Sequence, residues 1–323
     1  LELATDEAEQ IALRTRLGLL REQQLGNVEL AIETYRGVLD GDPTNAQVIE
    51  ALERLIHEPE QRAAVADMLQ PIYERQDEWQ KLVEVFEIQR EEAVDQHRKV
   101  ELLHRIAGLH QDRGGDAGEA FRTYARAFEV NPGDERTIGH MHRIAEALGL
   151  WVELVDVYRG QVYDIADMAV ATAVHKRVAK VLLGQVGDIE GARGHYEAAY
   201  ENDDTDLEVI EALEEIYKQT AQWHELVAVL QRKSELTEAA QAKKDLFFQI
   251  SAVYEDMLGD QERAVESFLA VLEVDEVDPN ALDALERIYM ALERWEDLLE
   301  VLEKKASLQT ELNAKKDIYY VIG

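Results

Sequence analysis

Four related stretches decide the fold: WQKLVEVF (79–86), WVELVDVY (151–158), WHELVAVL (223–230) and WEDLLEVL (295–302). Each begins with one of the four tryptophans of the chain, and each lies 72 residues after the one before it, as from 79 to 151. Self-similarity at a fixed period of this length is the signature of a repeat architecture. The chain is therefore expected to be an array of similar units.

The apolar residues of these stretches have helical spacing. Trp79, Leu82, Val83 and Phe86 stand at i, i+3, i+4 and i+7, which places them on one face of an amphipathic helix. We expect the tryptophans to head a buried stripe and to serve core packing. Three further helical patterns fit into each period, so one 72-residue unit is predicted to hold four helices, paired as two hairpins of about 36 residues.

A glycine followed by an Asn or Asp marks one hairpin turn in every unit. Glycine accepts the left-handed conformation beyond a helix end, and the next side chain can cap the following helix. Four and eight residues after the Asn or Asp come an alanine and an aromatic residue, which let two helices approach and fill the adjacent space. The four turns are Gly26-Asn27, Gly115-Asp116, Gly187-Asp188 and Gly259-Asp260.

The hairpin GDAGEAFRTYARAFEVNP (115–132) resembles the tetratricopeptide repeat, whose pattern is carried here by Gly115, Ala120, Tyr124, Ala127 and Pro132. The copies at residues 187 and 259 lack the proline, and the tryptophan hairpins are more divergent. The resemblance implies an all-α, right-handed α-solenoid of about eighteen antiparallel helices. It also implies a scaffold that binds peptides or proteins along a groove.

The repeat covers residues 1–323 as a single continuous solenoid with one irregularity. The distance from Gly26 to Gly115 is 17 residues longer than the period, which predicts one extra helix at about residues 44–76, broken at Pro59. The stretch 317–322 repeats 245–250 and the chain then stops within a helix pattern. We therefore expect a fragment of a longer array.

Composition excludes several classes of function. The net charge is −33, from 67 acidic and 34 basic residues, and a chain this acidic is repelled by nucleic acid and by anionic lipid. The excess of acidic residues is explained most simply by a solvated surface, and the alternative is that the acidic surface recruits a basic partner. No cysteine is present, so neither disulfides nor thiolate sites can form. Cytoplasmic and periplasmic locations are both compatible with these features, and membrane insertion is not expected.

No pattern indicates catalysis, a metal or a cofactor. His140 and His142 stand two residues apart on different sides of a helix, and His224-Glu225 lacks the second histidine of a zinc-protease motif. Acidic pairs are too frequent to identify a catalytic carboxylate. The chain is predicted not to be an enzyme.

Basic residues near the start of the helix after each tryptophan helix are the one pattern with functional promise. The helix dipole disfavours cations there, so something must compensate for them. One interpretation is ion pairing with the preceding helix, for example with Glu91-Glu92 or Glu235. The other is a basic ladder in the groove that holds an acidic peptide. The candidate groove contacts are Arg98, Lys99, Arg105, Lys176, Arg177, Lys180, Lys243 and Lys244, and the last copy is Lys315-Lys316.

The function predicted from the sequence is a non-enzymatic scaffold for a protein or peptide partner. One alternative is a structural array that self-associates by end-to-end stacking through Ile318, Tyr319 and Ile322. Another alternative is the regulatory region of a larger enzyme. The identity of the partner is not encoded in any recognisable motif.

Overall fold

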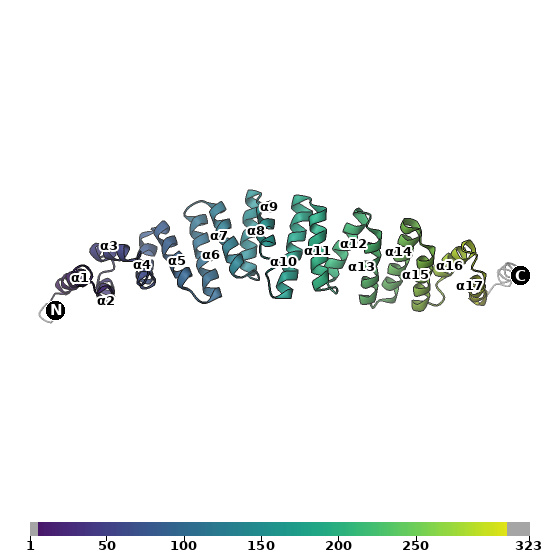
Figure 1. Cartoon of the computed structure of the whole chain (residues 1–323), viewed down its shortest axis with the longest axis horizontal. Coiled ribbons are helices and arrows are strands. Elements are labelled where there is room, and N and C mark those ends of the chain that lie inside the picture. The colour runs from purple at the N-terminus through teal and green to yellow at the C-terminus, as the bar shows by residue number, and fades with distance from the viewer. Residues whose placement is uncertain (1–5, 309–323) are drawn as a thin grey trace. The chain divides into compact units, whose positions relative to one another are not determined.

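The structure is a computed structural model that describes residues 6–308. This part of the chain folds into seventeen α-helices and contains no strand (Figure 1). The helices form two compact units that divide after Ile165. The expected all-α architecture of helical hairpins is confirmed.

Unit 1 contains nine of the described helices, which follow one another as short-turned hairpins. Their bounds are α1 Glu7–Gln23, α2 Val28–Gly41, α3 Ala46–Leu55, α4 Arg62–Gln76, α5 Trp79–Glu92, α6 Gln96–Asp112, α7 Ala117–Val130, α8 Glu135–Leu148 and α9 Trp151–Arg159.

Unit 2 contains the other eight, and two of them continue into a short π-helical segment. Their bounds are α10 Met168–Val181 with η1 Leu182–Val186, α11 Ile189–Asn202, α12 Leu207–Gln219, α13 Trp223–Leu236, α14 Ala240–Ala252 with η2 Val253–Leu258, α15 Gln261–Val274, α16 Pro279–Ala291 and α17 Trp295–Leu308.

The glycine turns join α1 to α2, α6 to α7, α10 to α11 and α14 to α15, as the sequence predicts. The φ angle is +66° at Gly115 and +78° at Gly187, in the region that disfavours a side chain. The next residue caps the second helix: Asp116 accepts a hydrogen bond from the Glu119 amide at 2.8 Å, and Asp188 accepts one from the Gly191 amide at 2.9 Å.

The small and aromatic residues after each turn form the contact between the two helices. Ala120 and Ala192 are fully buried, and Tyr124 and Tyr196 beside them are each 3% exposed. The alanine permits close approach of the helix backbones, and the aromatic ring fills the adjoining space. The alanine and the aromatic residue therefore form the core of each of these hairpins.

The tryptophan hairpins turn in another way, which the sequence did not reveal. The residue two before each tryptophan adopts a left-handed conformation, with φ between +55° and +73°. Glycine occupies this position once, as Gly149, whereas the other copies hold Asp77, Ala221 and Glu293. A residue with a Cβ pays for this conformation in strain, because the Cβ crowds the following carbonyl oxygen.

Replacing Ala221 with glycine should therefore stabilise the protein. Relief of the left-handed strain outweighs the added freedom of the unfolded chain, for a net gain of up to about 1 kcal/mol. Urea denaturation followed by circular dichroism measures the change. Ala242→Gly, on exposed helical backbone of α14, should instead lose about 1 kcal/mol. A loss at Ala221 as large as that at Ala242 would contradict the interpretation.

The tryptophans are less buried than expected. Each is the first residue of its helix; Trp79, Trp151 and Trp223 are half-buried and Trp295 is 60% exposed. Trp79 covers the end of α6, where its ring meets His110 edge-on at 6.0 Å and a Cβ at Gly114 would approach it to 3.1 Å. The tryptophan rings cover the edge of each hairpin. The fully buried stripe begins one turn later, at Leu82 and its counterparts.

This placement predicts unequal costs along α5. Phe86 is 1% exposed, so Phe86→Ala should cost about 3–5 kcal/mol of stability, while the half-exposed Trp79→Ala should cost roughly half as much. Chemical denaturation of the two variants measures both values. A larger loss at Trp79 than at Phe86 would show that the tryptophan carries the core.

Two helices, α3 and α4, lie between α2 and the tryptophan helix α5, whereas one helix, α12, lies between α11 and the tryptophan helix α13. α4 precedes the tryptophan helix α5 as α12 precedes α13 and α16 precedes α17. α3 begins at its cap Asn45 and buries Val48, Ala51, Leu52 and Leu55 on one face. The turn between α3 and α4 contains Pro59.

Candidate functional site

The same face of two equivalent helices, α6 and α10, is hollowed. The α6 hollow has a volume of about 710 Å³ and a floor made of Leu82, Phe86 and Leu109. The α10 hollow has a volume of about 630 Å³ and a wall of small side chains, Ala169, Thr172 and Ala173. The period of 72 residues aligns five pairs of lining residues, which are Glu101 with Ala173, His104 with Lys176, Arg105 with Arg177, Gly108 with Lys180, and Arg136 with Glu208.

The proposed groove contacts divide between these hollows and other positions. Arg98 and Arg105 line the α6 hollow, and Lys176, Arg177 and Lys180 line the α10 hollow. Lys99, Lys243 and Lys244 lie outside both. Lys315-Lys316 and the stacking residues Ile318, Tyr319 and Ile322 lie outside the described residues.

Several of these cations are tethered within the fold. Lys176 on α10 contacts Asp206 at 2.6 Å and Glu208 at 2.5 Å, and Lys180 also contacts Glu208. Asp206 is the cap of α12, where it accepts a hydrogen bond from the Glu208 amide at 3.0 Å. The lysine thus ties α10 to the start of the next hairpin.

A second lysine makes the same kind of contact with a capping carboxylate in the next 72-residue repeat. Lys244 on α14 contacts Asp275 and Asp278, each at 2.8 Å. Asp278 is 5% exposed and caps α16 through the Asn280 amide at 3.0 Å. Lys244 stands one helical turn earlier on its helix than Lys176 does, so its Asp278 partner is 34 residues away rather than 30.

In unit 1, a histidine makes the corresponding contact with a capping carboxylate. His104 on α6 lies 2.7 Å from the Thr137 hydroxyl and 3.4 Å from the carboxylate of Asp134, the cap of α8. The Thr137 hydroxyl donates to Asp134, so its oxygen accepts from His104 Nε2. Burial first, and then the positive charge of Arg136, hold the pKa of His104 below its ordinary value.

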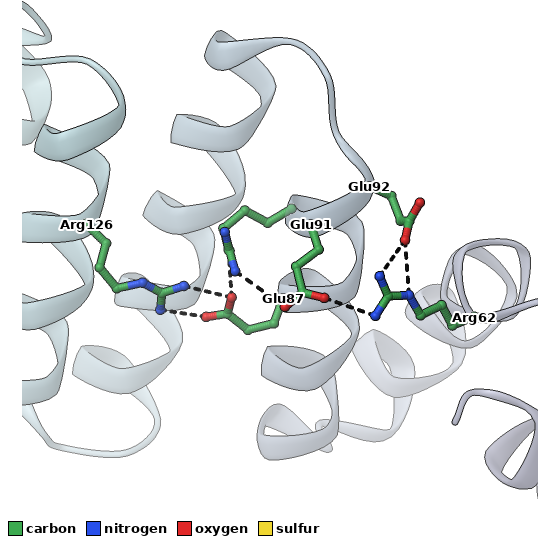
Figure 2. A network of polar contacts seen from close by, with 6 residues as sticks. Arg62, Glu87, Glu91, Glu92 and Arg126 are labelled. Carbon is green, nitrogen blue, oxygen red and sulfur yellow. Dashed lines mark hydrogen bonds and ion pairs between the residues drawn. The ribbon is translucent and has the colours of Figure 1, made fainter. Parts of the chain in front are cut away.

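The carboxylates that contact Lys176, Lys180 and Lys244 do not belong to the preceding helix. Glu91 and Glu92 of α5 instead bind Arg62 of α4, at 3.1 and 2.7 Å (Figure 2). Glu235 binds Arg232 of its own helix at 2.7 Å. The carboxylates that neutralise the lysines come from the following hairpin.

Figure 2 shows how α5 is held from both sides. Arg126 of α7 makes two hydrogen bonds to Glu87, at 2.7 and 2.8 Å, and Arg90 adds a third at 2.7 Å. Burial alone would raise the pKa of the Glu87 carboxyl, but the arginine hydrogen bonds outweigh it, so that pKa lies below its ordinary value. The network fixes α5, whose Leu82 and Phe86 form the floor of the α6 hollow.

Both hollows are charge-balanced or basic on a chain with twice as many acidic as basic residues. The α6 hollow is lined by Arg98, Arg105, Arg113 and Arg136 against Glu74, Glu101 and Asp112. The α10 hollow is lined by Lys176, Arg177 and Lys180 against Asp203, Asp206 and Glu208. An acidic segment therefore meets less repulsion here than an average part of the surface would give it.

The described residues show neither a cluster of metal ligands nor a helix that could span a membrane. His175 and His195 are buried and face each other with their Nδ1 atoms 3.0 Å apart. Across residues 6–308, no group of three or more His, Cys, Asp or Glu side chains is placed to hold a metal ion. None of the described helices is long and apolar enough to cross a membrane.

The tetratricopeptide repeat family matches residues 209–244 and 281–314. Both matches begin in the helix before a tryptophan helix, α12 or α16, and so cover the hairpins whose sequence diverges more from the family pattern. The part of the chain that these two matches cover is therefore similar to the tetratricopeptide repeat, and the described helices of both units have an all-α helical-repeat architecture.

Solved structures of such repeat proteins are similar to the chain. YrrB, described as a TPR protein with an unusual peptide-binding site, is 14% identical over 57% of this chain and 90% of its own, with a TM-score of 0.33. The C-terminal part of a TPR repeat-containing protein from Cytophaga hutchinsonii is 13% identical over 78% and 98%, with a TM-score of 0.34. A tetratricopeptide repeat protein from Parabacteroides merdae is 13% identical over 97% and 99%, with a TM-score of 0.23. No curated protein matches the sequence.

The lysine tether predicts how acid affects unit 2. Hydrogen bonds from Lys176, then from Lys180, lower the pKa of the Glu208 carboxyl from 4.5 to about 2. Since the folded-state pKa is depressed, this contribution to stability is complete above the ordinary pKa and is lost as pH falls toward about 2. Glu208→Gln should therefore flatten the pH dependence of the denaturation midpoint below about pH 5.

Glu201→Gln, at the exposed end of α11, provides a charge-matched control for that titration. Its midpoint should follow the unmodified protein throughout the acid range. Equal pH dependence in the Glu208 and Glu201 variants would show that the tether contributes no pH-dependent stability.

Proposed function

We propose that the chain is a non-enzymatic protein-interaction scaffold in which the hollow on α6 of unit 1 and the hollow on α10 of unit 2 each hold a peptide or protein segment. The observation that carries the proposal is the recurrence of a hollow on the same face of equivalent helices, in each case with basic residues in its wall.

Small residues make room for a ligand at both places. Ala169, Thr172 and Ala173 stand at i, i+3 and i+4 on α10, so they form one shallow strip of the helix face. Gly108 does the same on α6, where an added Cβ would meet nothing within 4 Å. A ligand backbone can therefore approach both helices closely.

The cations in the hollows serve two different purposes in this proposal. Lys176 is neutralised by the capping carboxylate of Asp206, and its first role is to join hairpins. Arg105 and Arg177 occupy the same register in the two hollows, and Arg105 is stacked over the Phe86 ring at 4.3 Å. One guanidinium nitrogen of Arg105 binds Glu74 at 2.8 Å, and its other N–H groups can serve a ligand. Arg105 is therefore the preferred groove contact.

Self-assembly through the ends and regulation of an enzyme depend on residues outside 6–308 or on sequence that this chain does not contain. Both therefore stay predictions. No observation on the described helices favours either over partner binding.

Filling the α10 hollow tests the proposal. Ala169 is exposed and lines the hollow, so Ala169→Trp should remove most partner capture in a pull-down from the source organism while leaving the helical circular dichroism unchanged. Gln231→Trp, on the exposed face of α13, adds the same ring away from both hollows and should capture partners normally. Unchanged capture by Ala169→Trp would contradict binding in this hollow.

A further inference from the structure

Two arginines of α8 stand out because no acidic side chain pairs with them. Arg136 and Arg143 are both exposed, and neither forms an ion pair with any other described residue. The chain has 67 acidic side chains for 34 basic ones, and most of the arginines and lysines on the surrounding helices are paired. Arg136 and Arg143 differ from other unpaired arginines of the described chain, such as Arg36 and Arg75, because they lie on one helix and one of them lines the α6 hollow.

The two arginines belong to one stripe of α8. Arg136, His140 and Arg143 stand at i, i+4 and i+7, so they share one helix face. The acidic residues of the helix, Glu135 and Glu146, lie roughly a quarter turn away from this face at 100° per residue. We call Arg136, His140 and Arg143 the α8 stripe.

The stripe is held rigidly at its centre. The His140 ring stacks on Tyr124 of α7 with the centroids 4.5 Å apart and the planes 5° from parallel. Burial and then the charges of Arg143 and Arg136 lower the pKa of His140, against the opposing effect of Asp134. The two arginines therefore act on the same small region, and His140 does not add a third positive charge at neutral pH.

The stripe continues into the α6 hollow. Arg136 also lines that hollow, beside its apolar floor of Leu82, Phe86 and Leu109. Two of the carboxylates that line the hollow are already used, since Glu74 binds Arg105 at 2.8 Å and Glu101 binds Arg98 at 3.4 Å. Asp112 is the lining carboxylate without an ion pair among the described residues. One carboxylate cannot neutralise two arginines, so the surface keeps an excess of positive charge.

We infer that the α8 stripe and the α6 hollow together bind an extended acidic segment of a partner protein, with two carboxylates at Arg136 and Arg143 and one apolar side chain in the hollow. This inference rests on the proposed scaffold function and names the chemistry of the partner. Guanidinium groups pair with carboxylates through two parallel hydrogen bonds. Gly139, where an added Cβ would meet nothing within 4 Å, leaves space for the segment between the arginines.

The helix geometry sets the spacing of the two acidic residues. Seven residues of α-helix span about 10.5 Å, and three residues of a segment in the polyproline II conformation span about 9.3 Å and complete one turn. The segment should therefore carry acidic side chains three positions apart, which then share one side. Adjacent acidic residues of such a segment point in different directions and lie only about 3 Å apart along it, so they cannot reach both arginines.

Fluorescence anisotropy with labelled synthetic peptides tests the inference. The probe is an eight-residue peptide with two glutamates three positions apart and a flanking leucine, and the comparison peptide has the same composition with the glutamates adjacent. The intact chain should bind the probe at least tenfold more tightly than the comparison peptide. The double variant Arg136→Glu/Arg143→Glu should lose at least tenfold in affinity for the probe.

Arg36→Glu/Arg75→Glu provides the matched control. Both arginines are exposed and without an ion pair among the described residues, and the variant makes the same change in net charge. It should lose less than threefold. Equal losses in the two double variants, equal affinity for the two peptides, or no binding of the probe would each overturn the inference.

Partner capture separates this inference from the proposed function. If Arg136→Glu/Arg143→Glu captures partners normally while Ala169→Trp does not, the scaffold function stands and the acidic-segment inference falls. If both variants capture partners normally, the scaffold function falls as well. Circular dichroism and the melting temperature of each variant confirm that the fold is intact.

Discussion

The carboxylate that caps the first helix of a hairpin is the interaction on which the rest of the fold depends. The first amides of a helix have no partner within the helix, so the cap must accept from them. Asp134, Asp206 and Asp278 do this, and each also receives a side chain from a helix about thirty residues earlier in the chain. One group thus starts a helix and fixes its position on the preceding hairpin.

The chemistry of the partner differs from copy to copy, although the capping carboxylate does not. A histidine with a threonine serves α8, while lysines serve α12 and α16. The carboxylates are negative at neutral pH and partly or fully buried, so each requires a positive charge or a hydrogen-bond donor nearby. This requirement explains Lys176 and Lys244, and Lys176 lies in the second half of α10, where the helix dipole does not oppose a positive charge.

The tethers also shape the candidate site. Lys176 is drawn toward Asp206 and Glu208, and the small residues before it on α10 leave a hollow that no side chain of the helix fills. On α6, His104 takes the buried tether while Arg105 is held over Phe86, and the arginines of the neighbouring helix α8 border the same hollow.

Much of the fold could be predicted from sequence because its determinants are local. Gly115 and Asp116 predict the turn that they form. Ala120 and Tyr124 predict the contact between the two helices of the hairpin. The left-handed Ala221 carries no such signal, because its conformation is imposed by packing of the hairpin. The burial of the tryptophan side chains was predicted to be greater than it is, because the spacing of an apolar stripe does not show that its first residue lies at the edge of the hairpin. The tethers were missed because Lys176 and Asp206 meet only after three helices have folded.

The central claim is that partners bind on the hollowed face of α6 and α10, and hydrogen–deuterium exchange with and without a captured partner tests it most directly. The account predicts that the partner slows exchange in α6, α8 and α10 and leaves α5, α7 and α11 unchanged. Slowing concentrated in α5, α7 and α11, with α6 and α10 unaffected, would contradict it.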